Sequence, residues 1–138
     1  MRRSRWMVSA LPIAVVLTLA AGTISPAWAQ EVRLEAELIA TNADPLASGK
    51  AKFESRADRT RFSTEAQDVS TDRMGLVTVT RPGVGIIQSN NITIAGGVGD
   101  LNLDTRDGDI VVAMQTGDTV QVFDSAGNLI LTGTLAPK

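Results

Sequence analysis

From residue 32 onward, apolar and polar residues alternate with a period of two. In residues 32–40 the even positions are apolar, whereas positions 33, 35 and 37 are charged. This period is typical of a half-buried β-strand, because successive side chains of a strand point to opposite faces. Further strands are expected at residues 50–55, 76–80, 84–88 and 92–95, with a turn at Asn90-Asn91 between the last two. No stretch after residue 30 shows a helical period.

Turn-forming residues separate these runs about every 8 to 12 residues, which is typical of sandwiches and barrels. We therefore expect residues 30–138 to form a single all-β domain, an antiparallel β-sandwich of immunoglobulin-like or jelly-roll-like type. Because the chain has no cysteine, apolar packing and backbone hydrogen bonds must hold this domain together without disulfides.

Two hairpins are predicted in detail. The first has residues 56–59 as its loop, and one register satisfies core and charge together by pairing Phe53 with Phe62, Glu54 with Arg61, and Lys50 with Glu65. The second has residues 124–127 as its loop, pairing Val122 with Leu129 and Val120 with Leu131. Gly127 suits the positive φ that such loops need.

The first 29 residues have the pattern of a cleaved signal peptide. A cationic start (Arg2, Arg3 and Arg5) precedes a mostly apolar run over residues 10–22, and residues 27–29 fit a small-x-small cleavage site. The apolar run is shorter than the roughly 20 residues that span a bilayer. We therefore expect an exported protein, periplasmic or secreted, with no transmembrane span after cleavage.

Composition excludes several classes of function. The chain has no histidine and no cysteine, so serine–histidine, cysteine–histidine and zinc-ligand sets cannot form. Of 13 basic residues three precede residue 30, whereas all 15 acidic residues follow it, so residues 30–138 carry a formal charge of −5. Nucleic-acid binders carry basic faces, so a nucleic-acid partner is not expected. The sequence predicts a non-enzymatic protein without a cofactor.

One segment is rich in side-chain oxygens that suit a calcium ion, namely Asp100, Asn102, Asp104, Asp107 and Asp109. Positions 1, 3 and 5 match an EF-hand loop, but position 6 is Thr105 and position 12 is Val111, where glycine and an acidic residue are required. The alternative is a strand whose wet face carries the polar residues while Leu101 and Leu103 enter the core. Gly-Asp pairs also recur every nine residues from residue 99, a spacing similar to that of a calcium-binding β-roll. Asp100 lies one position earlier than the roll requires, and a meander of short strands with Gly-Asp at its turns gives the same spacing.

A basic group departs from the acidic background and consists of Lys50, Lys52, Arg56, Arg59 and Arg61. One interpretation is a patch for an anionic partner, such as a lipid headgroup or a polyanionic glycan. The other is the charge-paired outer face of the first hairpin, with Lys50 and Arg61 engaged by Glu65 and Glu54.

Residues 38–53, Leu-Ile-Ala-Thr-Asn-Ala-Asp-Pro-Leu-Ala-Ser-Gly-Lys-Ala-Lys-Phe, resemble the opening of CHRD (chordin-type) domains. These are all-β extracellular modules that begin with a strand, a proline-containing loop and a glycine-led second strand. The acidic-x-Pro-Pro core of that motif is present here only as Asp44-Pro45. The chain also looks like the small exported β proteins of unknown function common in bacteria. The resemblance implies a fold and an extracytoplasmic location, and it transfers no site residue.

The sequence therefore predicts an exported, non-enzymatic β domain that acts as a binding or structural component of the cell envelope or secreted matrix. Its expected partner is an envelope protein or a polyanionic surface. Two alternatives stay open. One is a weak calcium-dependent module centred on residues 100–109, and the other is a hydrolase that uses two carboxylates contributed by distant strands.

Overall fold

The computed structural model describes residues 31–71 and 73–138, so the predicted signal peptide at residues 1–29 lies outside the described residues. Residues Val32–Lys138 form one unit. It contains nine strands and a short 3-10 helix in the order β1 (Val32–Ala40), β2 (Ser48–Arg56), β3 (Arg59–Gln67), β4 (Met74–Arg81), β5 (Gly85–Ala95), β6 (Val98–Asp104), η2 (Thr105–Asp107), β7 (Thr119–Phe123), β8 (Leu129–Thr134) and β9 (Ala136–Pro137). The all-β prediction is confirmed.

All nine strands belong to one sheet, in the order β2-β3-β6-β5-β4-β7-β8-β1-β9, and β1 also pairs with β2. This second pairing of β1 closes the sheet into an antiparallel barrel of eight strands. The predicted two-sheet sandwich is therefore corrected to a single closed sheet. Both architectures bury one face of every strand, so the alternation that identified the strands does not distinguish between them.

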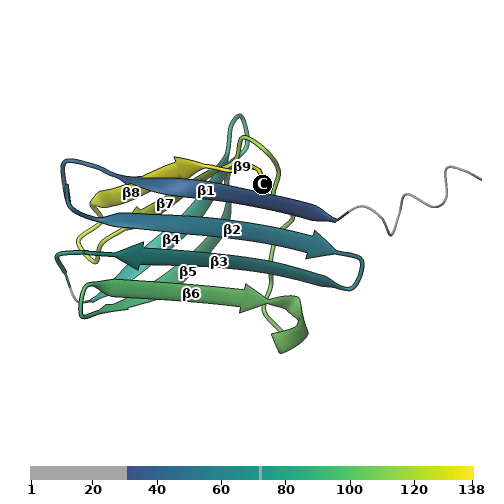
Figure 1. Cartoon of the computed structure of the whole chain (residues 1–138), viewed down its shortest axis with the longest axis horizontal. Coiled ribbons are helices and arrows are strands. Elements are labelled where there is room, and N and C mark those ends of the chain that lie inside the picture. Colours follow the sequence, from purple (N-terminus) through teal and green to yellow (C-terminus); the bar gives the residue numbers. More distant parts are fainter. Residues whose placement is uncertain (1–30, 72) are drawn as a thin grey trace, which may run out of the picture. The chain divides into compact units, whose positions relative to one another are not determined.

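The barrel is flattened. Figure 1 shows β1, β2, β3 and β6 as one layer in front of β4, β5, β7 and β8. The two layers are joined by short ladders: β1 pairs with β8 only at Ile39 and Ala40, and β5 pairs with β6 only over residues 93–95. The front layer therefore presents a broad outer face, which carries the candidate site.

The first predicted hairpin has the expected register. Phe53 lies opposite Phe62, and both rings are buried in the core between the layers. Glu54 lies opposite Arg61 on the outer face. The loop is shorter than expected, because Arg56 and Arg59 already pair and only residues 57–58 connect them.

The register predicted for the second hairpin is wrong. The observed pairs are Val122 with Leu131, Val120 with Gly133, and Phe123 with Leu129, with an irregularity between Val122 and Phe123. The loop is longer than expected, because the Asp124 carboxylate accepts hydrogen bonds from the backbone N–H groups of Ala126 and Asn128. Gly127 does have a positive φ, of 90°.

The turn expected at Asn90-Asn91 is also absent, because β5 runs without interruption through both residues. Val77 and Leu76 of β4 pair with Asn90 and Asn91. Backbone pairing with β4 therefore overrides the local turn preference of asparagine.

Closure of the barrel depends on a glycine. A Cβ atom placed on Gly133 of β8 would overlap the backbone carbonyl oxygen of Glu37 on β1. We expect Gly133→Ala to lower the free energy of unfolding by about 1 to 3 kcal/mol, the usual cost of overpacking. Chemical denaturation measures this loss, and Thr134→Ala at an exposed neighbouring position is the control. Equal stability of the two variants would contradict this account of the closure.

Candidate functional site

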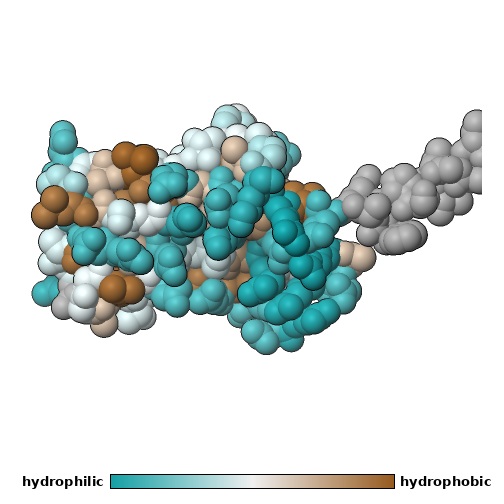
Figure 2. All heavy atoms as spheres, in the orientation of Figure 1, coloured by the Kyte–Doolittle hydropathy of each residue, from teal (hydrophilic) through white to brown (hydrophobic). Residues whose placement is uncertain are grey.

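The outer face of the front layer is built from rows of side chains that run across the strands. Because β1, β2, β3 and β6 are paired in register, residues two apart on each strand fall into successive rows. The first row, called the ion-pair row, contains Arg33, Glu54, Arg61 and Asp104. The second row, called the polar row, contains Glu35, Lys52, Ser63 and Asn102. Hydrophilic residues cover much of this face and gather toward the β2–β3 turn (Figure 2).

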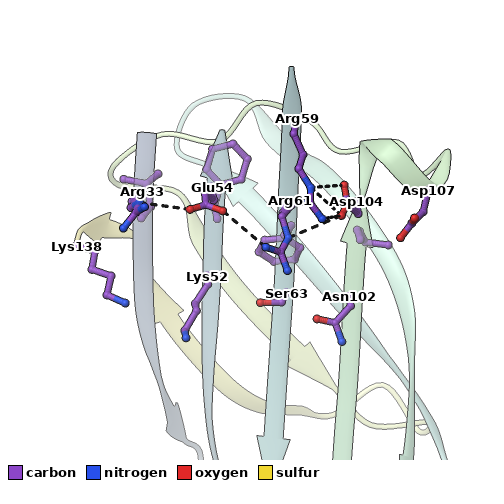
Figure 3. Close-up of a pocket in the computed structure, with 14 residues that line it drawn as sticks. Arg33, Lys52, Glu54, Arg59, Arg61, Ser63, Asn102, Asp104, Asp107 and Lys138 are labelled. Carbon is purple, nitrogen blue, oxygen red and sulfur yellow. Dashed lines mark hydrogen bonds and ion pairs between the residues drawn. The ribbon is translucent and has the colours of Figure 1, made fainter. Parts of the chain in front are cut away.

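Charges alternate along the ion-pair row. Glu54 forms an ion pair with Arg33 on one side, with Oε2 and Nε 3.3 Å apart, and its Oε1 lies 3.9 Å from Arg61 Nη1 on the other. Arg61 Nε is also 3.9 Å from Asp104 Oδ2. These contacts join side chains of all four strands into one chain of ion pairs (Figure 3).

Arg59 fixes the end of this row. Its Nε lies 3.1 Å from Asp104 Oδ1 and 3.0 Å from Oδ2, and its Nη2 also donates to Oδ2. The hydrogen bonds from Arg59, assisted by the backbone N–H of Arg106, lower the pKa of Asp104 to about 2. Asp104 is therefore ionised near neutral pH and belongs to a stable ion pair.

The side chains of the polar row are less involved in ion pairs. Among the described residues, Lys52 forms no ion pair, and Glu35, its neighbour across β1 and β2, instead lies 3.8 Å from Lys138 Nζ. Asn102 Nδ2 donates to Asp100 Oδ1 over 3.2 Å. In Figure 3, Lys52, Ser63 and Asn102 project side by side from three neighbouring strands below the ion-pair row.

The ion-pair row and three members of the polar row, Lys52, Ser63 and Asn102, line a groove with a volume of about 580 Å³. Its charged lining has five cations against three anions, namely Arg33, Lys52, Arg59, Arg61 and Lys138 against Glu54, Asp104 and Asp107. This local excess of positive charge contrasts with the formal charge of −2 of the whole chain. A smaller hollow of about 80 Å³ adjoins the groove and shares Lys52, Ser63 and Asn102 with it.

The predicted basic group is only partly brought together. Lys50, Lys52 and Arg61 lie on the outer face, whereas Arg56 and Arg59 flank the β2–β3 turn. Arg61 lies near Glu54, as the charge-paired alternative expected, and Arg59 is held by Asp104. Lys50 lies opposite Glu65 in the ladder, but no ion pair joins them. Among the described residues, Lys50 and Lys52 are therefore the two cations of this group without an ion pair, and of these two only Lys52 lines the groove.

The predicted acidic residues are spread over a strand and a turn. Asp100, Asn102 and Asp104 lie on the outer face of β6 and Leu103 is buried, which confirms the strand interpretation. The Asp109 carboxylate already has a hydrogen-bond partner, since its Oδ2 accepts from the backbone N–H of Asp104 over 3.0 Å. Within the described ranges, no three acidic side chains are close enough to hold a metal ion. The calcium module stays a prediction, and Asp107 at the end of η2 lines the groove instead.

Two buried carboxylates with a structural role, Asp118 and Asp44, were not predicted from the sequence. Asp118 is fully buried and accepts two hydrogen bonds from Arg81, at 3.0 and 2.8 Å. Asp44 is buried as well, and its Oδ2 accepts from the backbone N–H and the hydroxyl of Ser70. The dipeptides Gly117-Asp118 and Asp44-Pro45 are typical of turns, so the local sequence predicts a turn at each carboxylate. It does not indicate a hydrogen-bond partner more than 25 residues away in the chain.

The chain matches no protein-family model and no curated protein. The resemblance to CHRD domains therefore stays a prediction. In the part of the chain that the structure describes, no helix is long and apolar enough to cross a membrane.

Proposed function

We propose that this protein is an exported, non-enzymatic binding domain, and that it holds an anionic group of its ligand in the groove of the front layer. The observation that carries the proposal is Lys52. It is exposed, has no ion pair among the described residues, and stands beside Ser63 and Asn102 in a groove with excess positive charge. An ammonium, a hydroxyl and a side-chain amide are together well suited to a carboxylate or a phosphate.

The arginines support this proposal in a different way. Arg59 and Arg61 contact the Asp104 carboxylate, and Arg33 contacts Glu54. These contacts hold the guanidinium groups at the wall of the groove, so a ligand meets a cationic surface that is already ordered. Binding then loses less side-chain entropy than it would with free arginines.

Three carboxylates line the groove, and two of them, Glu54 and Asp104, come from distant strands, as the hydrolase alternative requires. Acid catalysis by such a pair needs one carboxyl group with a raised pKa. The pKa of Asp104 is instead lowered, chiefly by its hydrogen bonds with Arg59. Both carboxylates are engaged by arginine side chains, which favours a binding role over catalysis.

The expected ligand is a component of the envelope or secreted matrix that carries carboxylate or phosphate groups. Export follows from the predicted signal peptide, and the CHRD resemblance points to the same location. The acidic background of the chain favours a ligand that is held locally in the groove over broad adhesion to a polyanion.

Titration of the ¹⁵N-labelled protein with inorganic phosphate tests the proposal. We expect saturable chemical-shift changes at the amides of Ser63 and Asn102, and a dissociation constant that rises about tenfold in Lys52→Ala, because a charge-assisted hydrogen bond contributes about 1.5 to 3 kcal/mol. The matched control is Arg73→Ala, which removes an exposed cation outside the groove. Equal weakening in both variants would show general attraction of anions and contradict a specific site.

A further inference from the structure

Large apolar side chains are exposed at the end of the barrel where β1 ends and β6 begins. They are Ile39, Leu46, Met74 and Val98, they are between 50% and 82% exposed, and we call them the apolar end. Figure 2 shows separate apolar groups at this end, whereas hydrophilic residues gather toward the β2–β3 turn. This face of the molecule therefore has an apolar end and a charged end.

The loops at the apolar end are bound to one another. The buried Asp44 carboxylate of the β1–β2 loop accepts hydrogen bonds from the backbone N–H and the hydroxyl of Ser70 in the β3–β4 loop, at 2.9 and 3.1 Å. The backbone N–H of Val69 in the same loop donates to the carbonyl of Gly97 in the β5–β6 turn over 3.0 Å. Three loops are therefore fixed relative to one another, and their apolar side chains are presented to solvent on an ordered support. Binding through them loses little loop entropy.

The exposed area is too small and too divided for a stable protein interface. Four apolar side chains supply at most about 400 Å², at roughly 100 Å² each, whereas each partner of a stable interface buries about 800 Å². A protein partner would also need a separate pocket for each protruding side chain. A bilayer surface has no fixed shape, and binding to it scales with the apolar area that enters the headgroup region.

The charges at the two ends of the barrel decide which end suits a bilayer. Among the described residues of the three loops, the exposed charged residues are Asp68 and Arg73, whose charges cancel. The opposite end also exposes an aliphatic side chain, Ile110, but its β2–β3 turn and η2 carry the exposed ion pair of Asp58 and Arg106. Contact of that end with lipid would remove water from these charges, which is costly. The apolar end avoids this cost and gains nothing from an anionic lipid.

We propose that the apolar end binds a zwitterionic lipid surface, with Leu46, Met74 and Val98 entering the headgroup region of the bilayer. This interaction goes beyond the proposed function, because none of these residues lines the groove. The two are compatible, since the ion-pair row lies beside the β2–β3 turn, at the other end of the front layer. A domain bound in this way presents the groove away from the membrane.

Co-sedimentation with phosphatidylcholine vesicles tests the proposal. Residues 1–29 contain an apolar run of their own, so the test uses residues 30–138, which contain every strand of the barrel. We expect saturable binding that does not change when part of the lipid is anionic phosphatidylglycerol. Leu46→Ser should weaken binding about tenfold, because it removes the most exposed side chain of the apolar end. Ile110→Ser, which removes a side chain with the same exposure of 82% from the opposite end, should bind as the parent does.

A fluorescent label locates the contact without relying on affinity. The chain has no cysteine, so Leu46→Cys and Ile110→Cys each provide a single attachment site for an environment-sensitive dye. We expect the emission to shift to shorter wavelength on addition of phosphatidylcholine vesicles in the labelled Leu46→Cys variant only. An equal shift in both variants would show general adsorption of apolar surface and would overturn the proposal.

Three further results would overturn it as well. Binding only to anionic vesicles, with loss at high salt, would mean that charge and not apolar contact holds the lipid. Weakening by Lys52→Ala but not by Leu46→Ser would mean that the lipid phosphate occupies the groove, which supports the proposed function alone. Absence of vesicle binding, together with self-association that Leu46→Ser abolishes, would assign the apolar end to a second copy of the chain.

Discussion

Phe62→Ala is expected to lower the free energy of unfolding by about 3 to 5 kcal/mol. Phe62 is 1% exposed and lies opposite Phe53, so its removal leaves a cavity between the two layers. Domains of this size are stable by about 5 to 15 kcal/mol, so the loss is a large part of the total. Urea denaturation followed by far-ultraviolet circular dichroism measures it.

The control for this prediction is Gln67→Ala. Gln67 lies on the same strand but is exposed, so its truncation opens no cavity. We expect its unfolding midpoint to remain close to that of the parent protein. A Phe62→Ala loss below about 1 kcal/mol would mean that the barrel collapses around the missing ring, and that the rings do not hold the layers apart.

The β2–β3 hairpin shows when sequence determines register. Pairing Phe53 with Phe62 also pairs Glu54 with Arg61, so the core and the charges favour the same alignment. In the β7–β8 hairpin, no charged pair supports the alignment of the apolar residues. Its aliphatic residues permit several alignments, and the hydrogen bonds of the Asp124 carboxylate select one that the pattern does not predict.

The closure of the barrel and the groove depend on contacts between distant segments. The local sequence predicts Ile39 and Ala40 as the end of an ordinary strand, and nothing in that sequence indicates that they also pair with β8. Of the residues at the centre of the groove, Lys52 was predicted as part of a basic patch and Asn102 as part of a calcium loop. Ser63 was not predicted, because a single serine in a strand carries no signal until its neighbours across the sheet are known.

Asp118→Ala is expected to destabilise the fold by on the order of 3 kcal/mol, the usual loss when one partner of a buried ion pair is removed. The Asp118 carboxylate is fully buried and binds the Arg81 guanidinium and, over 2.9 Å, the backbone N–H of Gln115. Arg81 also donates to the carbonyl of Ala113. The variant therefore loosens the long β6–β7 connection as well as the end of β4.

The same pair predicts a pH dependence with a definite sign. The hydrogen bonds from Arg81 hold the pKa of Asp118 below its ordinary value of 3.8, so the stability contributed by this carboxylate is present above about pH 4 and is lost as the pH falls through the lowered pKa. Asp118→Asn keeps the shape of the side chain but does not titrate. The stability difference between the parent protein and this variant should therefore be constant from pH 5 to 7, at or below the loss expected for Asp118→Ala. It should shrink as the pH falls below about 4 and through the lowered pKa of Asp118. Urea unfolding across this range measures the difference, and one that stays constant throughout would show that the Asp118 carboxylate contributes through its shape and hydrogen bonds and not through its charge.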